Sequence, residues 1–248
     1  MAEGLTYGGL FLGFALIWGR TLWYLSERAA LTQTLTLRLM AYVGPGRDTV
    51  RSLLLSAAYL GLGLAACLAF SLIAGLPLSD ALTLRPSHFA PTVLGIVAEV
   101  SLCNLLVSLY VGAVGPRRAP FHEIATIPWI EGLRQTPSGL APLMGAFAAA
   151  TEELFFRGVV LLILLNVTGP LWAVVIAGLL FWVQQVIQVR TRFQAVVISA
   201  GCIAISLVGG LLVLATGSVL PAVICHAAFV LFFLGQEGAN GRPAQRRP

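Results

Sequence analysis

Residues 145–165 read GAFAAATEELFFRGVVLLILL, an apolar run that two glutamates and one arginine interrupt near its middle. A helix needs about 20 mainly apolar residues to cross the hydrocarbon core of a bilayer, which is about 30 Å thick. The run has that length and predicts a transmembrane helix. An ionised side chain at the bilayer centre costs about 2.5 to 3.5 kcal/mol, so charged groups there are expected to be paired or to face a water-filled cavity.

The rest of the chain has the composition of a membrane protein. Of its 248 residues, 58% are hydrophobic and 10% are charged, and the mean hydropathy is +0.91. Soluble domains carry about 25% charged residues, so a water-soluble fold is excluded. Similar apolar runs predict an all-α, polytopic transmembrane bundle of about seven helices, with eight as the alternative. The predicted spans are Tyr7–Leu25, Ser52–Leu78, Phe89–Val114, Gly139–Leu165, Pro170–Ile187, Phe193–Ala215 and Ser218–Leu234.

The positions of the arginines predict the orientation of the bundle. All 15 basic residues are arginines, and positively charged loops stay on the cytoplasmic side of a membrane. Only Arg85 falls on one side, and Arg157 lies inside a span. The other side holds Arg20, Arg28, Arg38, Arg47, Arg51, Arg117, Arg118, Arg134, Arg190, Arg192, Arg242, Arg246 and Arg247. We therefore expect a multi-pass protein of the cell (inner) membrane with its amino terminus outside and its carboxyl terminus in the cytoplasm. Attraction to anionic lipid accounts for the positive charge, and no nucleic-acid partner is expected.

Three regions follow from this pattern. Residues 1–138 are expected to form amino-terminal transmembrane helices with basic cytoplasmic loops, 139–235 a core that holds the charged helix, and 236–248 a disordered tail. The segment Ser26–Arg51 is expected either to form an amphipathic helix on the inner leaflet or to remain a loop.

The charged residues of span Gly139–Leu165 divide into two groups. Glu153 and Arg157 are four residues apart and share one helix face, which predicts an ion pair. Glu152 points about 100° away and has no partner in its own helix. Burial favours the neutral form of such a carboxyl group, and a carboxyl group that exchanges its proton suits a general base. The alternative is a purely structural ion network that joins this span to its neighbours.

Further polar side chains lie in other apolar spans. His226 lies in the span Ser218–Leu234. Gln184 and Gln185 lie in the span Pro170–Ile187, and Gln188 continues their polar stripe directly after it. Buried histidines and glutamines commonly link helices by hydrogen bonds, so a packing role is the alternative to a role in a site. Glu99 is expected either to line the same cavity or to pair with an arginine.

Together, Glu152-Glu153-x-x-x-Arg157, Phe181-x-x-x-Gln185 and the segment from Thr216 to Ala227 that contains His226 resemble the CAAX protease and bacteriocin-processing family. The resemblance covers roughly residues 141–234. The family signature is EExxxR, FxxxH and HxxxN on successive membrane helices, and its members are similar to the CAAX prenyl endopeptidases, glutamate-dependent intramembrane proteases. The resemblance implies that Glu152 activates water, that Glu153 and Arg157 hold it in place, and that His226 donates to the oxyanion.

The chain departs from the signature at two positions. Gln185 stands where the family has histidine, and Val230 stands where it has asparagine. A missing oxyanion donor typically lowers turnover about 100- to 1,000-fold, which weakens catalysis without abolishing it. Whether Gln184, His122 or Glu123 compensates is left open by the sequence.

The resemblance thus implies an intramembrane glutamate-dependent endopeptidase. Its substrates would be membrane-anchored peptides or protein carboxyl termini, such as prenylated proteins, maturing peptides or sorting anchors. The main alternative is a catalytically weakened pseudoprotease that acts as a membrane scaffold or a bacteriocin-immunity-type protein and binds a partner membrane protein. A transporter that relays protons through Glu152 and Glu99 is less favoured, because no inverted repeat is visible.

A zinc protease is not expected. His122 and Glu123 begin an HExxH pattern, but Thr126 stands in place of the second histidine. No metal ligand set and no cofactor are therefore predicted.

Overall fold

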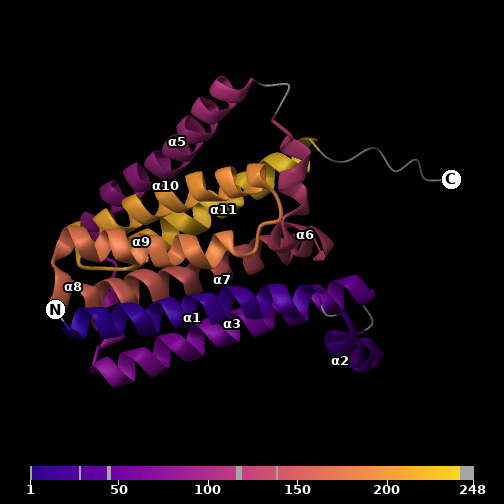
Figure 1. The fold of residues 1–248 in the computed structure, drawn as a ribbon, viewed down its shortest axis with the longest axis horizontal. Helices are drawn as coiled ribbons and strands as arrows, with labels where there is room; N and C mark the ends of the chain where they lie inside the picture. The colour runs from indigo at the N-terminus through magenta and orange to yellow at the C-terminus, as the bar shows by residue number, and fades with distance from the viewer. Residues whose placement is uncertain (1, 28, 44–45, 116–118, 138, 241–248) are drawn as a thin grey trace.

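The computed structural model describes residues 2–27, 29–43, 46–115, 119–137 and 139–240. Within these ranges every regular element is a helix and no strand is present, which confirms the prediction of an all-α bundle (Figure 1). One long helix consists of α7 (Ala141–Glu153), the π-helical segment η4 (Leu154–Leu161) and α8 (Leu162–Thr168). The other long helices are α1 (Ala2–Glu27), α3 (Arg47–Ala74), α5 (Phe89–Val114), α9 (Pro170–Val186), α10 (Arg192–Thr216) and α11 (Leu220–Asn240).

Each predicted span coincides with one of these long helices. Three described stretches, Arg47–Ala74, Pro86–Val114 and Arg192–Thr216, are long and apolar enough to cross a membrane. Pro170–Val186 and Leu220–Leu234 are shorter apolar helices. Residues 7–25 and 141–165 are helical throughout, although Arg20 interrupts the apolar run of the first predicted span and the charged cluster interrupts that of the second.

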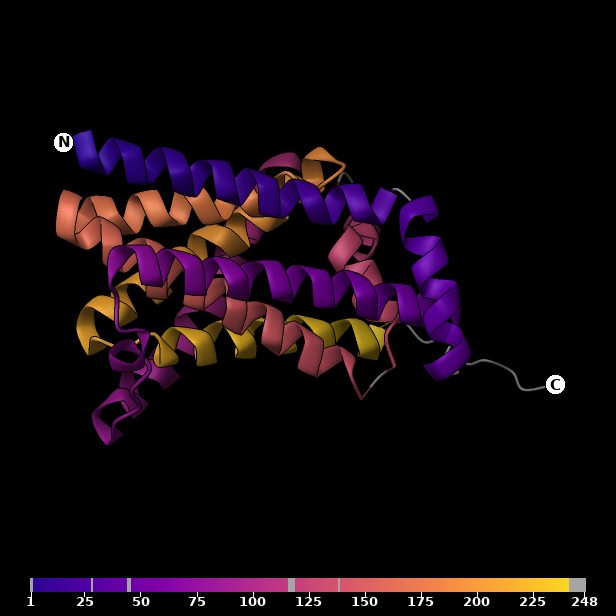
Figure 2. The same cartoon turned by 90° about the horizontal axis from the view of Figure 1, so that it is seen from below.

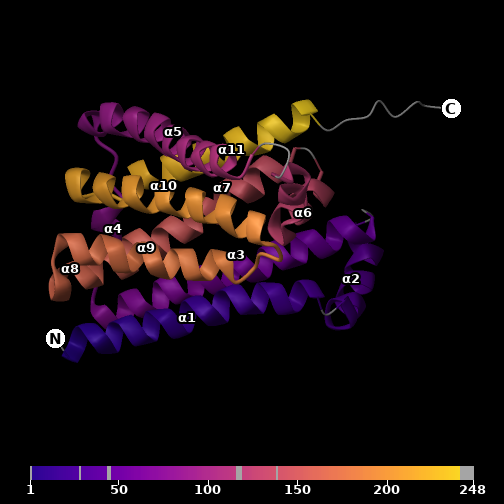
Figure 3. The ribbon, with the colours of Figure 1, turned by 45° about the horizontal axis from the view of Figure 1, so that its top comes forward.

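The long helices lie side by side in a layered arrangement. Figure 3 shows α5 at one side of the bundle next to α10 and α11, with α1 and α3 at the opposite side. The helix that contains α7, η4 and α8 lies between them and contacts α3, α9 and α11. This central position places the charged cluster of residues 152–157 in the interior of the bundle.

The two ends of the bundle differ in character. Helix α1 begins at one end and α11 ends at the other (Figure 1). Helix α2 (Ala29–Val43) lies transverse to α1 and α3 at the end where they connect, so the segment 26–51 is largely helical rather than a loop (Figure 2). The short helix α6 (Pro128–Gln135) lies at this same end. The described arginines that predicted the orientation lie on the helices that meet at this end, or, for Arg190, in the connection between α9 and α10: Arg20, Arg38, Arg47, Arg51, Arg134, Arg190 and Arg192.

Some predictions fall outside the described residues. These are Arg28, Arg117, Arg118, Arg242, Arg246 and Arg247, together with most of the expected tail. The expected disorder from residue 236 onward differs from the structure, in which α11 continues to Asn240. Residues 235–240 contain no proline to break the helix, and the first proline of the tail is Pro243.

Aromatic rings join α1 and α3 to the charged helix. The ring centroids of Phe14 and Phe155 are 4.8 Å apart, and those of Trp18 and Tyr59 are also 4.8 Å apart. The indole of Trp18 is fully buried and donates a hydrogen bond to the backbone oxygen of Tyr59 at 3.1 Å. These contacts hold the middle of α3 against the helix that carries the glutamates.

The outer faces of the helices are apolar. Large hydrophobic side chains with more than half of their surface exposed include Leu68, Ile73, Phe89, Leu94 and Leu171. Such faces are unusual for a protein in water and are typical of helices that contact lipid.

Gly63 permits the closest approach in this part of the core. A Cβ at Gly63 would lie 2.5 Å from both Thr151 Cγ2 and Trp18 Cζ2. Overpacking of this kind costs about 1 to 3 kcal/mol. We predict that Gly63→Ala lowers the thermal unfolding temperature of the purified protein in detergent.

Gly61→Ala is the matched control, because no atom lies within 4 Å of a Cβ at that position of the same helix. It should leave the unfolding temperature unchanged or raise it slightly, because alanine favours helix more than glycine does. Equal effects of the two substitutions would contradict the packing described for Gly63.

Candidate active site

The helix changes its hydrogen-bonding pattern directly after the two glutamates. Glu152 and Glu153 are the last residues of α7, and the next eight residues, Leu154–Leu161, form the π-helical segment η4. Single π-helical turns inside α-helices are rare and are often found at functional sites. Arg157 lies within this segment, so the widened turn sets the position of its guanidinium.

Glu153 and Arg157 form a buried ion pair. Arg157 Nη1 lies 3.1 Å from Glu153 Oε1, and the two side chains are 2% and 0% exposed. The guanidinium carbon lies 4.9 Å from the ring centroid of Phe181, at cation–π distance. Gly209 of α10 leaves room for the pair, because a Cβ there would be 3.3 Å from Glu153 Oε2.

His226 of α11 lies between the two glutamates. Its Nδ1 is 3.0 Å from Glu153 Oε1, and its Nε2 is 3.8 Å from Glu152 Oε2. The first distance is that of a hydrogen bond, whereas the second is too long for one. The imidazole is therefore held by Glu153 and presents its second nitrogen toward Glu152.

The carboxylate of Glu152 is held through one of its two oxygens. Its Oε1 accepts hydrogen bonds from Gln185 Nε2, at 2.8 Å, and from the Tyr59 hydroxyl. Tyr59 in turn accepts a hydrogen bond from Gln184 Nε2 at 2.7 Å. Tyr59 was not among the predicted site residues, because its only signal in the sequence is a hydroxyl group in an apolar span.

A cavity of about 830 Å³ opens beside these groups. Glu152, Gln185, His226 and Tyr59 contribute to its wall, and so does Val230, while most of the wall is apolar. Helices α3, α5, α7, α9, α10 and α11 surround the cavity, and α6 and the 3-10 helix η3 (Phe121–Thr126) cover the end that carries the arginines. The structure thus brings Glu152, Glu153, Arg157, Gln185 and His226 into one cluster with access to this cavity.

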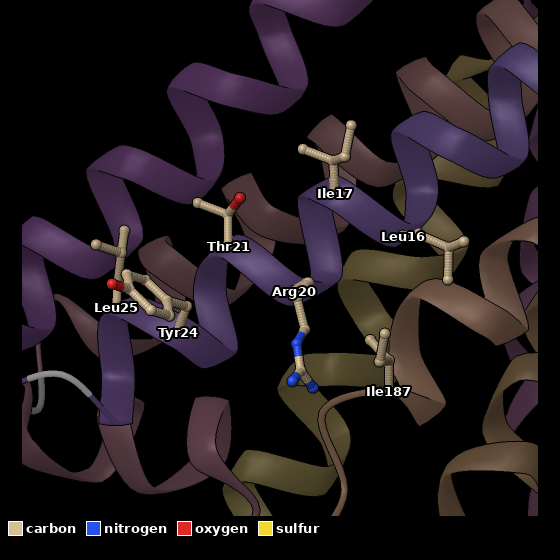
Figure 4. Close-up of a pocket in the computed structure, with 7 residues that line it drawn as sticks. All are labelled: Leu16, Ile17, Arg20, Thr21, Tyr24, Leu25 and Ile187. Atoms are coloured by element: carbon tan, nitrogen blue, oxygen red, sulfur yellow. The ribbon is translucent and has the colours of Figure 1, made fainter.

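A second cavity lies away from the cluster. It measures about 450 Å³ and is lined by residues of α1 and by Ile187, and the Arg20 side chain extends from α1 on the side where Ile187 lies (Figure 4). None of the five predicted site residues lines it.

The remaining polar residues of the sequence analysis have separate positions. Glu99 is fully buried, does not line the cavity and interacts electrostatically with Glu153 and Arg157. Neither of its carboxylate oxygens has a hydrogen-bond partner among the described residues. Glu99 therefore does not line the cavity, and no ion pair joins it to an arginine among the described residues, so neither alternative for Glu99 is confirmed.

His122 and Glu123 belong to the covering segment and are not part of the cluster. Glu123 accepts a hydrogen bond from Thr191 Oγ1 at 2.5 Å, and its backbone oxygen accepts one from Gln194 Nε2 at 2.7 Å. These bonds tie η3 to the beginning of α10. His122 lines the cavity at its exposed end. In the described part of the chain, no group of three or more His, Cys, Asp and Glu side chains is arranged to hold a metal ion.

Comparison with known proteins supports the resemblance that the motifs indicated. Residues 134–232 match the family model described as "Type II CAAX prenyl endopeptidase Rce1-like". The matched segment covers less than half of the chain and includes all five residues of the cluster, whereas Tyr59 lies outside it. Comparison with the curated proteins and with the solved structures returned no match. The family is one of CAAX-type proteases, and together with the apolar helices it indicates an integral membrane protein.

The effects of Glu153 and Arg157 substitutions on the free energy of unfolding should be strongly coupled. Removal of one member of such a pair typically costs about 3 to 5 kcal/mol, because the other charge remains buried without compensation. We expect Arg157→Met to lower the free energy of unfolding by about this amount, as measured by SDS titration in mixed micelles. The double variant Glu153→Gln/Arg157→Met should lose less stability than the sum of the two single variants.

Glu152→Gln serves as the comparison, because Glu152 is held by neutral donors rather than by an arginine. It should lower the free energy of unfolding by less than Arg157→Met does, because the Gln side chain keeps an oxygen that can accept the hydrogen bonds of Tyr59 and Gln185. Additive losses in the Glu153 and Arg157 variants would contradict the coupling.

Proposed function

We propose that this protein is an intramembrane, glutamate-dependent endopeptidase that cleaves membrane-anchored peptides or protein carboxyl termini. The observation that carries the proposal is the arrangement of Glu152 and His226. One carboxylate oxygen of Glu152 is held by two donors, and the other faces a histidine across a 3.8 Å gap at the wall of a large cavity.

Glu152 Oε2 and His226 Nε2 are close enough for one water molecule to contact both from the cavity, beside the 3.8 Å line that joins them. Polar groups that are more than about 3.5 Å apart are often bridged by water. A water molecule beside Glu152 Oε2 would lie within reach of both the base and a peptide carbonyl group in the cavity. General-base catalysis requires this kind of direct contact.

The proposed reaction uses one particular protonation state of His226. An ionised Glu153 can only accept hydrogen bonds, so the Nδ1 of His226 that faces it must carry a proton. With a second proton on Nε2, the imidazolium and Arg157 together neutralise the charges of Glu152 and Glu153. In this state His226 Nε2 can donate to the oxygen of a tetrahedral intermediate.

The proposed reaction uses these groups in sequence. Glu152 Oε2 removes a proton from water as the water oxygen attacks the carbonyl carbon of the peptide. His226 Nε2 donates to the oxygen that becomes negatively charged. Glu152 then passes its proton to the amine nitrogen as the C–N bond breaks, which restores the carboxylate and releases both products. Glu153 and Arg157 keep the imidazole and the helix in place throughout.

The two departures from the family signature are expected to slow this reaction. Gln185 donates to Glu152 Oε1 and helps to orient it, but an amide cannot exchange a proton. Val230 lines the cavity with an aliphatic side chain that offers no hydrogen bond. These same departures favour the second candidate function, a pseudoprotease that binds a membrane-anchored peptide or a partner membrane protein without cleaving it.

The orientation in the membrane is part of the proposal. The basic end of the bundle, with α2 and α6, would face the cytoplasm, with the amino terminus outside the cell (inner) membrane. Helix α2 would then lie along the inner leaflet. The cavity extends to η3 and α6 at this end, so the substrate would reach Glu152 from the cytoplasmic half of the bilayer.

The assay for the proposed activity uses quenched fluorescent peptides that are anchored in liposomes by a prenylated cysteine or by a transmembrane helix. We expect Glu152→Gln to lower kcat by about 100- to 10,000-fold, because the amide cannot accept the proton of water. Glu131→Gln makes the same chemical change at an exposed position on α6 and should retain full activity. Unaltered cleavage by Glu152→Gln would refute the assigned role.

A second prediction separates the peptidase from the pseudoprotease. In a peptidase, His226→Ala should lower kcat by about 100- to 1,000-fold, as is typical for loss of an oxyanion donor. Gln185→His should change kcat measurably, because it places an imidazole, which can exchange a proton, next to Glu152. Binding of the anchored peptide without cleavage by the wild type and by every variant would support the scaffold instead.

A further inference from the structure

Tyr59 lies outside the segment that matches the family and outside every motif of the sequence analysis. It is nevertheless in direct contact with Glu152, which is 93 positions further along the chain. The residue is buried at 8% exposure and its side chain lines the same cavity. It comes from α3, a helix that contributes none of the five predicted site residues.

The surroundings of Tyr59 fix both its ring and its hydroxyl proton. The ring stacks on Trp18 with an interplanar angle of 29°, and the Trp18 indole donates to the Tyr59 backbone oxygen. The Gln184 amide nitrogen can only donate, so it occupies a lone pair of the hydroxyl oxygen. The single hydroxyl proton is thus directed to Glu152 Oε1.

The hydrogen bond from Tyr59 makes the surroundings of the two carboxylate oxygens of Glu152 different. Oε1 receives two hydrogen bonds, from Tyr59 and Gln185, whereas Oε2 faces His226 beyond hydrogen-bond distance. Donors to one oxygen of a carboxylate make that oxygen a poorer proton acceptor and hold the plane of the group. The remaining oxygen is therefore the one that is available to a water molecule in the cavity.

We propose that Tyr59 is a positioning residue for the reaction: it holds Glu152 by Oε1 so that Oε2 is presented to water and to His226. The inference rests on the proposed function of Glu152. In the proposed site, Tyr59 supplies a hydroxyl donor to Glu152 although it lies outside the matched segment. Its neighbour at Glu152 Oε1 is Gln185, which stands where the family has histidine. The chain Gln184–Tyr59–Glu152 then joins α9, α3 and α7 around the base.

Tyr59→Phe tests this role because it removes only the hydroxyl group and keeps the ring against Trp18. We expect kcat on the anchored peptide to fall about 10- to 100-fold, the range for loss of a hydrogen bond to a charged group, while KM stays unchanged. Tyr110→Phe removes a tyrosine hydroxyl from α5 at a position that does not line the cavity, and should leave both constants unchanged. Equal thermal unfolding temperatures of the two variants would show that folding is not the cause.

A second measurement does not depend on cleavage. The infrared carboxyl or carboxylate band of Glu152 is identified as the band that disappears in Glu152→Gln. We expect Tyr59→Phe to shift this band and Tyr110→Phe to leave it in place.

The outcomes separate the two proposals. If Glu152→Gln abolishes cleavage while Tyr59→Phe keeps full kcat and an unshifted band, the role of Tyr59 is overturned and the peptidase stands. If both variants cleave at the wild-type rate, the proposed function itself is overturned. If the wild type cleaves no anchored peptide, the proposed function falls, and the infrared band alone decides whether Tyr59 holds Glu152.

Discussion

The ion pair between Glu153 and Arg157 is the interaction on which the rest of the site depends. Two opposite charges with almost no exposure can persist in an apolar bundle only if each has partners close by. Phe181 from α9 covers the guanidinium, Gly209 from α10 leaves space for the pair, and His226 from α11 contacts the same carboxylate. Four helices are thereby brought to one point, and the functional groups they carry are brought together with them.

This arrangement gives the two adjacent glutamates different surroundings. Glu153 is turned toward Arg157 and the interior, whereas Glu152 is turned toward the cavity and held by neutral donors. The difference arises because adjacent residues of a helix point in different directions. Arg157 lies in the π-helical segment that begins at Leu154. Glu99 of α5 adds a third buried carboxyl group near the pair, and neither of its oxygens has a hydrogen-bond partner among the described residues.

The parts of this structure that sequence could predict are those with local patterns. Hydropathy located the long helices, and the spacing of four residues predicted the pair of Glu153 and Arg157. The contact of Tyr59 with Glu152 could not be predicted, because it joins distant spans and a tyrosine in an apolar helix has no periodic signal. The same holds for Glu123, whose role in tying η3 to α10 depends on how a loop meets a helix end. The glycine, proline and arginine content of the tail predicted disorder from residue 236, whereas α11 continues to Asn240.

Hydrolysis of an anchored peptide in water enriched in ¹⁸O tests the central claim most directly, because it follows the oxygen that Glu152 is proposed to activate. If Glu152 acts as a base on water, the new carboxyl group of the product carries ¹⁸O from the first turnover of unlabelled protein. If Glu152 attacks the peptide itself, hydrolysis of the resulting anhydride can return an ¹⁶O atom from its side chain to the first product. A first-turnover product without ¹⁸O, or no product in any turnover, would contradict the account.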